Sequence, residues 1–192
     1  MKQALSLALA LVLSVFTYSQ KFIITPKGLI NADDSTKTFV VVRLDSATAK
    51  ELYKRAYSYI QHTWKNPDFS NNGKVEGEFL HVKTYATNVT SFKANLGNTF
   101  WINLKYFLNL DFKDGKIRYE IVDLEMTCNT TGGPEGPLFL VSPGGLTWSI
   151  YKKDGAIVDK HKKTKDDLES YFNSQLSEFI GAIKSPAAKT DF

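Results

Sequence analysis

Three histidines and a single cysteine are the side chains of this sequence best suited to metal binding or nucleophilic chemistry. His62, His81 and His161 are far apart in the chain, and none has a second histidine or cysteine at the spacing of a metal site. Cys128 falls on the apolar side of a predicted strand, where a buried thiol is expected rather than a nucleophile with a lowered pKa. We therefore predict no metal, no cofactor and no catalytic residue.

The sequence also lacks the common motifs of nucleotide-binding and hydrolytic enzymes. Neither glycine-rich phosphate-binding pattern occurs, and there is no Gly-x-Ser-x-Gly nucleophile motif. We therefore favour a protein that is not an enzyme. The enzymatic alternative requires a site assembled from distant residues, and its form would be a hydrolase with carboxylates near the glycine- and proline-rich stretch 129–145.

The remaining functional candidates lie mainly on one predicted strand, 99–113. Large apolar side chains recur there at every second position, which predicts a strand with one buried face. The alternate positions mix aromatic with polar and charged side chains, a composition that is enriched in recognition surfaces. Together with one residue of the following strand they form the candidate partner-binding set: Trp101, Lys105, Phe107, Asn109, Asp111 and Arg118.

The aromatic members of this set allow two interpretations. Trp101 and Phe107 could face solvent and contact a partner. Alternatively, the apolar run 138–141 or the strand predicted at 146–152 could fold over them. The basic segment 152–165 could touch an anionic lipid or polysaccharide, but acidic residues interrupt it, and a solvated loop is the simpler expectation.

A hairpin over 99–128 must position the candidate residues. Asp114-Gly115 suits the positive φ angles of a two-residue turn, and counting from it pairs the strands. Farther from the turn, the same register would place acidic side chains on the apolar face. We predict a β-bulge at Ile121-Val122, because one extra residue restores the alternation and brings Lys105 opposite Glu125.

Amphipathic helices are predicted on either side of this hairpin in the sequence. The first would be capped by Asp45 or Ser46 and end near Pro67, and the second spans 164–184, where Thr164 and Asp167 resemble a capping box. The other expected elements are an extended lead-in and loop at 20–38, strands at 39–44, 74–85, 89–94 and 146–152, a polar turn at 68–73, and a long loop at 129–145 with at most one short strand.

The helices decide the fold class. Two helices with one apolar stripe each can cover only one face of a single antiparallel sheet. We predict one α+β domain over 20–184, with both helices on the even-numbered face of the strand at 99–113. The opposite face, which carries the candidate residues, is then left to solvent or to a partner.

The N-terminus resembles a secretory signal peptide. Residues 1–19 have a charged start, a short apolar core and small residues at the exit. The core is shorter than the roughly 20 residues of a membrane span, so we expect its removal and no transmembrane segment afterwards. Residues 185–192 are expected to be a flexible tail. The net charge of +4 is weak and predicts no nucleic-acid partner.

The order of elements and three local sequences resemble a family of bacterial envelope domains of unknown function with a TATA-binding-protein-like fold. The resemblance rests on Phe39 to Leu44, on the helix start Ala49 to Tyr53 and on Lys113 to Ile121, and it covers residues 37–127. It implies a β-α-β4-α unit and a secreted or periplasmic protein of a Gram-negative bacterium. It implies no catalytic residue, and a shared fold does not transfer DNA binding.

These observations favour an exported, non-enzymatic domain that binds a protein, peptide or envelope component through its open sheet face. The alternatives are the hydrolase described above and a structural assembly module that pairs through a sheet edge.

Overall fold

The computed structural model describes residues 20–64, 67–94, 97–130, 133–144 and 147–185. The predicted signal peptide and nearly all of the predicted tail lie outside the described residues.

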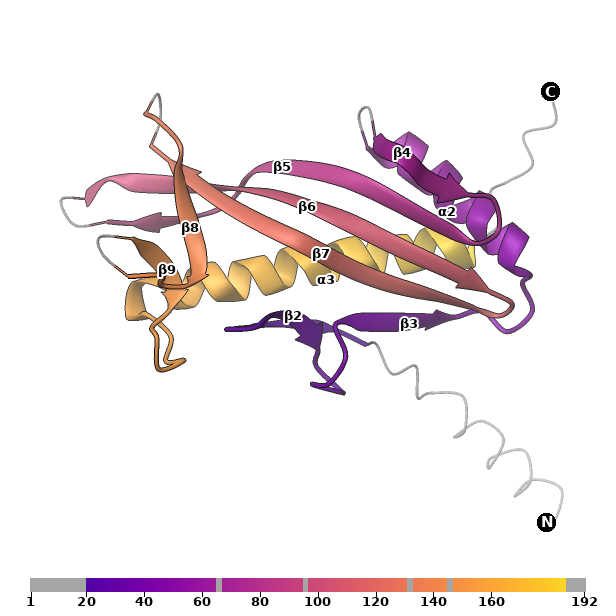
Figure 1. The fold of residues 1–192 in the computed structure, drawn as a ribbon, viewed down its shortest axis with the longest axis horizontal. Helices are drawn as coiled ribbons and strands as arrows, with labels where there is room; N and C mark the ends of the chain where they lie inside the picture. Colours follow the sequence, from indigo (N-terminus) through magenta and orange to yellow (C-terminus); the bar gives the residue numbers. More distant parts are fainter. Residues whose placement is uncertain (1–19, 65–66, 95–96, 131–132, 145–146, 186–192) are drawn as a thin grey trace, which may run out of the picture.

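A long twisted sheet forms the centre of the fold, and within the described parts of the chain it has seven strands. Figure 1 shows three of them, β5, β6 and β7, running side by side along the length of the molecule. Both β3 and β8 pair with β7 on the side away from β6, β3 near its start and β8 near its end. The strands are Phe39–Arg43 (β3), Asp68–Val75 (β4), Phe79–Lys93 (β5), Thr99–Lys113 (β6), Lys116–Asn129 (β7), Gly136–Val141 (β8) and Trp148–Tyr151 (β9).

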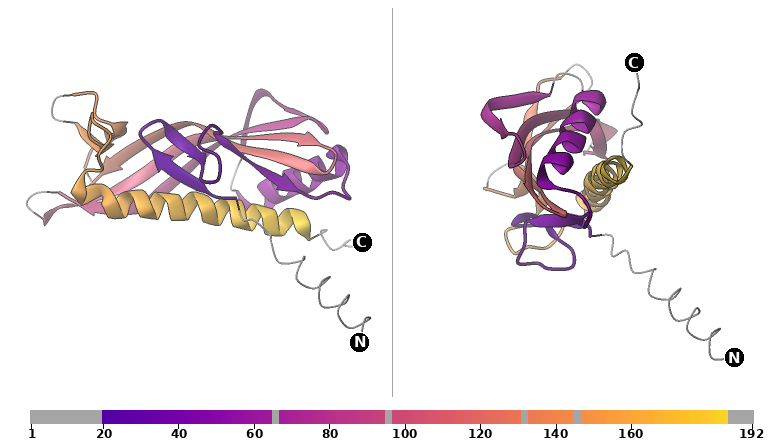
Figure 2. Two further views of the ribbon diagram at one scale, coloured as in Figure 1. Left: turned by 90° about the horizontal axis from the view of Figure 1, so that it is seen from below. Right: turned by 90° about the vertical axis from the view of Figure 1, so that its right-hand side faces the viewer.

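Helices α2 (Ala49–Thr63) and α3 (Lys162–Lys184) lie together on one face of this sheet, as both views of Figure 2 show. They pack on the even-numbered side chains of β6, which are buried from Ile102 to Phe112. Aromatic contacts join the layers, such as that of Tyr106 with Phe172, whose ring centroids are 5.4 Å apart. The arrangement of both helices on the even-numbered face is therefore as predicted.

One apolar stripe holds each helix against the sheet. Burial of a leucine, isoleucine or phenylalanine side chain contributes roughly 1.5–3 kcal/mol to stability. A stripe of several such residues therefore stabilises its helix more than an N-cap does, which contributes about 1 kcal/mol. The stripes are fully or almost fully buried and consist of Leu52, Ala56 and Ile60 in α2 and of Leu168, Phe172, Leu176, Phe179 and Ile183 in α3.

The start of α2 differs from the prediction. Thr48 is the N-cap and forms a capping box with Glu51, so neither Asp45 nor Ser46 caps the helix. Those two residues belong to a turn that packs on the β6–β7 hairpin, where Gly115 N donates to the carbonyl oxygen of Ala47 at 2.8 Å. Tertiary contact with the hairpin thus moves the helix start along the chain.

The start of α3 also differs. The helix begins at Lys162, and the predicted capping box of Thr164 with Asp167 is wrong. Thr164 is buried in the first turn, and Asp167 accepts hydrogen bonds from Thr90 of β5 and from Lys163. Asp167 therefore ties the helix to the sheet instead of closing the helix end.

The bulge predicted at Ile121-Val122 lies at Asp123-Leu124. Pairing of β7 with β6 is regular through Val122 and resumes with Lys105 opposite Glu125, as predicted for the far side of the bulge. Asp123 has φ 52°, in the left-handed region, which aspartate tolerates better than most residues. The bulge sits later than predicted because Val122 occupies the open face instead of the core.

The hairpin of β4 and β5 was only partly predicted. Gly77, at φ 80°, lies in the turn between them, so 68–73 is part of a strand and not a polar turn. The strands predicted at 74–85 and 89–94 are wrong in their bounds, because β5 runs through both. A register shift between Ala86 and Thr90, with Asn88 at φ 54°, interrupts the alternation and makes one strand resemble two.

The edges of the fold bring two further corrections. Residues 20–38 contain a separate antiparallel pair, Phe22–Thr25 (β1) and Gly28–Asn31 (β2), and not merely a lead-in and loop. This pair is held to α3 by side chains, since Phe22 N donates to Asn173 Oδ1 at 2.8 Å.

The prediction of a single antiparallel sheet is also wrong, because β8 and β9 run parallel. Side-chain alternation indicates the faces of a strand but not its direction.

His161 connects the start of α3 to the end of the sheet. It ends the short 3-10 helix η2 (Asp159–His161), is fully buried, and packs against the ring of Phe92 with centroids 4.4 Å apart. Its burial, together with the positive charge of Lys160, lowers the pKa of the imidazole from 6.5 to about 4. Below pH 6.5 the unfolded chain takes up a proton that the folded protein does not, so stability falls as the pH decreases from 6.5 toward 4.

We predict that His161→Phe, which keeps a ring at this position, removes this part of the acid sensitivity. The free energy of unfolding, measured by urea denaturation at a series of pH values, should decline less between pH 6.5 and pH 4 than in the wild type. His62→Gln, at an exposed position of α2, is the matched control and should leave the wild-type profile unchanged. Parallel profiles for His161→Phe and the wild type would contradict the assignment.

Candidate functional site

The sheet face away from the helices carries all six predicted site residues. Five come from β6 and the sixth from β7, and the strand register arranges them in rows that run across the sheet. Directly opposite residues on one face have Cβ atoms about 4.5–5.5 Å apart, so each row is a set of neighbours. We call this surface the open face: Trp101, Lys105, Phe107, Asn109, Asp111 and Arg118, with their cross-strand neighbours.

An aromatic pair occupies the middle of the open face. The ring of Phe107 stacks on His81 of β5, with centroids 4.4 Å apart and planes 14° from parallel. His81 Nδ1 is hydrogen-bonded to Asn109 Oδ1, which fixes the orientation of the imidazole. Trp101 lies near the start of β6, away from the β6–β7 turn, and remains 39% exposed. His81 was not predicted as a site residue, because only the pairing of β5 with β6 brings it to Phe107.

Arg118 is the best-anchored charged group of the open face. Its guanidinium lies 2.7 Å from a carboxylate oxygen of Glu120 and 3.6 Å from one of Asp111, and 4.3 Å above the ring centre of Phe39. The two carboxylates offset its charge. Lys105 is similarly paired with Glu125 at 2.7 Å. The Lys105–Glu125 pair follows the predicted register. The groups in all these ion pairs are at least partly exposed, so their contribution to stability is small.

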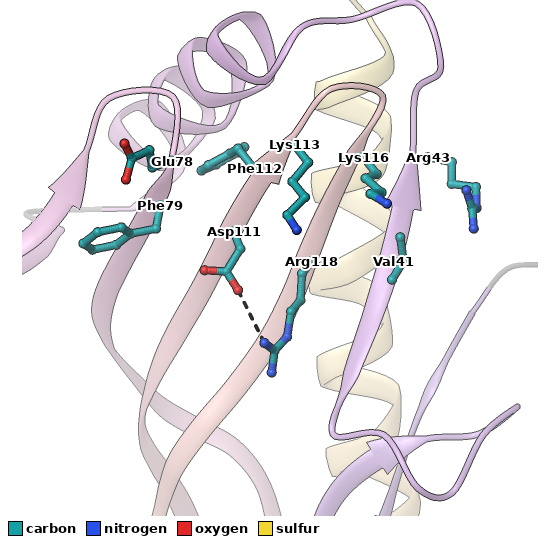
Figure 3. Close-up of a pocket in the computed structure, with 9 residues that line it drawn as sticks. All are labelled: Val41, Arg43, Glu78, Phe79, Asp111, Phe112, Lys113, Lys116 and Arg118. Atoms are coloured by element: carbon teal, nitrogen blue, oxygen red, sulfur yellow. Dashed lines mark ion pairs between the residues drawn. The ribbon is translucent and has the colours of Figure 1, made fainter.

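A cavity of about 530 Å³ lies at the end of the open face next to the β6–β7 turn (Figure 3). Of the predicted site residues, Asp111 and Arg118 reach it. The sequence did not indicate the others, because they come from four separate strand segments and one turn. The lining is Val41, Arg43, Glu78, Phe79, Asp111, Phe112, Lys113, Lys116 and Arg118.

The described part of the loop after β7 contacts the opposite end of the open face. Glu135 Oε1 accepts a hydrogen bond from Asn103 Nδ2 at 2.6 Å and one from the Tyr85 hydroxyl at 3.4 Å. The apolar run 138–141 does not fold over Trp101 and Phe107. It belongs to β8, which extends the sheet beside β7.

The groups suited to chemistry are dispersed in the described part of the chain. No three His, Cys, Asp or Glu side chains gather there as metal ligands. Cys128 is buried, and burial, with the nearby charge of Glu135, raises the pKa of its thiol to about 11. A second cavity, of about 610 Å³, lies between the end of α2, β5 and α3, and none of the six predicted residues lines it. Helices that are long and apolar enough to cross a membrane are absent from the described residues.

The architecture defines an α+β protein in which helices cover one side of a mixed sheet. Residues 39–127 match a family model described as a domain of unknown function (DUF4468) with TBP-like fold. Residues 39–127 therefore form a domain of this family, which confirms the family resemblance found in the sequence.

Two solved structures are similar to this chain. A TBP-like protein from Parabacteroides distasonis is 12% identical, with a TM-score of 0.50 over 77% of this chain and 91% of the other. A DUF4468 family protein from Bacteroides ovatus is 10% identical, with a TM-score of 0.48 over 79% of this chain and 87% of the other. At this identity the first likeness shows the fold alone. No curated protein matches the sequence.

The two faces of β6 should respond differently to truncation. We predict that Trp101→Ala with Phe107→Ala lowers the free energy of unfolding by no more than about 2 kcal/mol, because both rings keep exposed surface. Leu108→Ala alone, next to Phe107 but under the helices, should cost about 2–5 kcal/mol. Urea denaturation measures both. A larger loss in the double variant than in Leu108→Ala would show that the two rings belong to the core.

Proposed function

We propose that this protein is an exported binding module that holds a protein, peptide or envelope component against its open face. The main support for the proposal is that the open face carries partly exposed aromatic groups, Trp101 and the stacked pair of Phe107 with His81, among ordered polar side chains. Aromatic anchors surrounded by polar groups are typical of the residues that dominate binding energy at interfaces.

The open face is ordered before any partner arrives, which supports this proposal. Phe107 is fixed by stacking on His81, His81 by its hydrogen bond to Asn109, and Arg118 by its two carboxylates and the ring of Phe39. Side chains that are already immobilised lose less conformational entropy on binding. The same contacts contribute little to folding, because most of these groups stay partly exposed.

Export is part of the proposal and is supported by the sequence of residues 1–19, which has the three regions of a secretory signal peptide. An exported binding module would meet its partner in the periplasm or outside the cell. The native envelope fraction is accordingly the source in which a partner should be sought.

Comparative capture tests the proposal. The tagged wild-type protein, the double variant Trp101→Ala with Phe107→Ala, and a control variant with Tyr57→Phe in α2 are incubated with the native envelope fraction and crosslinked. We expect the wild type and the control to retain the same specific partner, and the double variant to lose most of it, since removal of interface anchors costs about 2 kcal/mol or more each. Equal capture by all three folded proteins would refute binding through the open face.

A further inference from the structure

Three cations form one row across the open face at its turn end. Lys113 of β6 is directly opposite Lys116 of β7, and Lys116 is directly opposite Arg43 of β3. All three side chains are exposed and line the cavity, and Figure 3 shows them on adjacent strands, with that of Arg43 directed away from the two lysines. None of the three forms an ion pair with another described residue.

Such a row is unfavourable by itself. Like charges directly opposite each other on neighbouring strands repel and lower the stability of the sheet. The adjacent row offers little relief, because the charge of Asp111 is already directed to Arg118, which Glu120 also pairs. An anion bound over Lys113, Lys116 and Arg43 would remove the repulsion, so the row favours a negatively charged ligand.

The surroundings of the row indicate what kind of anion fits. Phe79 and Val41 occupy the two ends of the neighbouring row and line the cavity. A small inorganic anion would use the cations but not this apolar surface. A ligand that carries both carboxylates and an apolar side chain would use both.

The length of the row indicates an elongated ligand. Neighbouring strands are about 4.8 Å apart, so the outer cations are separated by roughly 10 Å along the row. In an extended peptide, side chains that point to the same side repeat every 6–7 Å or so. Two carboxylates at alternate positions therefore fit between Lys113 and Arg43, with Lys116 in the middle.

We propose that the turn end of the open face binds an acidic, extended peptide segment of a partner protein. Carboxylates at alternate positions lie over Lys113, Lys116 and Arg43. An apolar side chain at the next alternate position, on the same side of the peptide, contacts Phe79 at one end of the cavity. This inference rests on the proposed function, because it assigns a ligand class to the same surface, but it depends on different residues from the aromatic anchors.

The test uses a short fluorescein-labelled peptide in which glutamate alternates with serine around a central phenylalanine, and a matched peptide with glutamine for glutamate. Fluorescence anisotropy with the full protein should show binding of the glutamate peptide at least about tenfold tighter than the glutamine peptide, weakening at high salt. Lys113→Gln with Lys116→Gln should weaken it by roughly fivefold or more. Lys54→Gln with Lys162→Gln, on the helices, makes the same charge change and should leave binding unchanged.

Other outcomes overturn the inference. Equal loss in both double variants would mean that net charge alone attracts the peptide. Equal binding of the two peptides would exclude recognition of carboxylates, and displacement by inorganic phosphate with no contribution from the phenylalanine would indicate a small-anion site. Urea denaturation should show that Lys113→Gln with Lys116→Gln is at least as stable as the wild type, so that lost binding is not lost folding. If this variant still captures the native partner while Trp101→Ala with Phe107→Ala does not, the acidic-peptide inference fails and the proposed function stands.

Discussion

The alternation of side chains along β6 is the constraint on which the rest of the structure depends. Even-numbered residues from Ile102 to Phe112 are buried beneath α2 and α3, and the odd-numbered residues between them point the other way. Successive side chains of a strand must occupy opposite faces, so the helices determine which residues remain available to a partner. The stripe of α3, from Leu168 to Ile183, is therefore as important to the open face as the residues on it.

The strands on both sides of β6 are irregular, and the bulge in β7 keeps the apolar side chains of the hairpin on one face. Asp123 in β7 and Asn88 in β5 each adopt positive φ. Near Asp123, β7 has one residue more than the facing segment of β6, and near Asn88, β5 has two more. Without the one extra residue of β7, every later side chain of that strand would change faces, whereas the two extra residues of β5 leave its faces unchanged. The short strand β3 pairs on the regular side of the β7 bulge, and this places Arg43 beside Lys116.

Local patterns were sufficient to predict the hairpin near Asp114-Gly115, the stripe of the last helix, and the face that carries Trp101 and Phe107. These features depend on periodicity and turn chemistry, which a sequence shows directly. The stacking of His81 on Phe107 and the row of three cations could not be predicted, because they require pairing between strands that are distant in the sequence. The parallel pairing of β8 with β9 was missed since side-chain patterns do not encode strand direction.

The rate at which introduced cysteines react with a thiol reagent measures most directly which face of β6 is exposed to solvent. Single cysteines are introduced at Trp101 and Asp111 on the open face, and at Leu104 and Leu110 on the covered face. The native Cys128 is buried and remains in place. We expect a thiol reagent to label the cysteines at positions 101 and 111 rapidly, and those at positions 104 and 110 only as fast as the protein unfolds. Rapid labelling at Leu104 and Leu110, or protection at Trp101 and Asp111 in the isolated protein, would contradict this expectation.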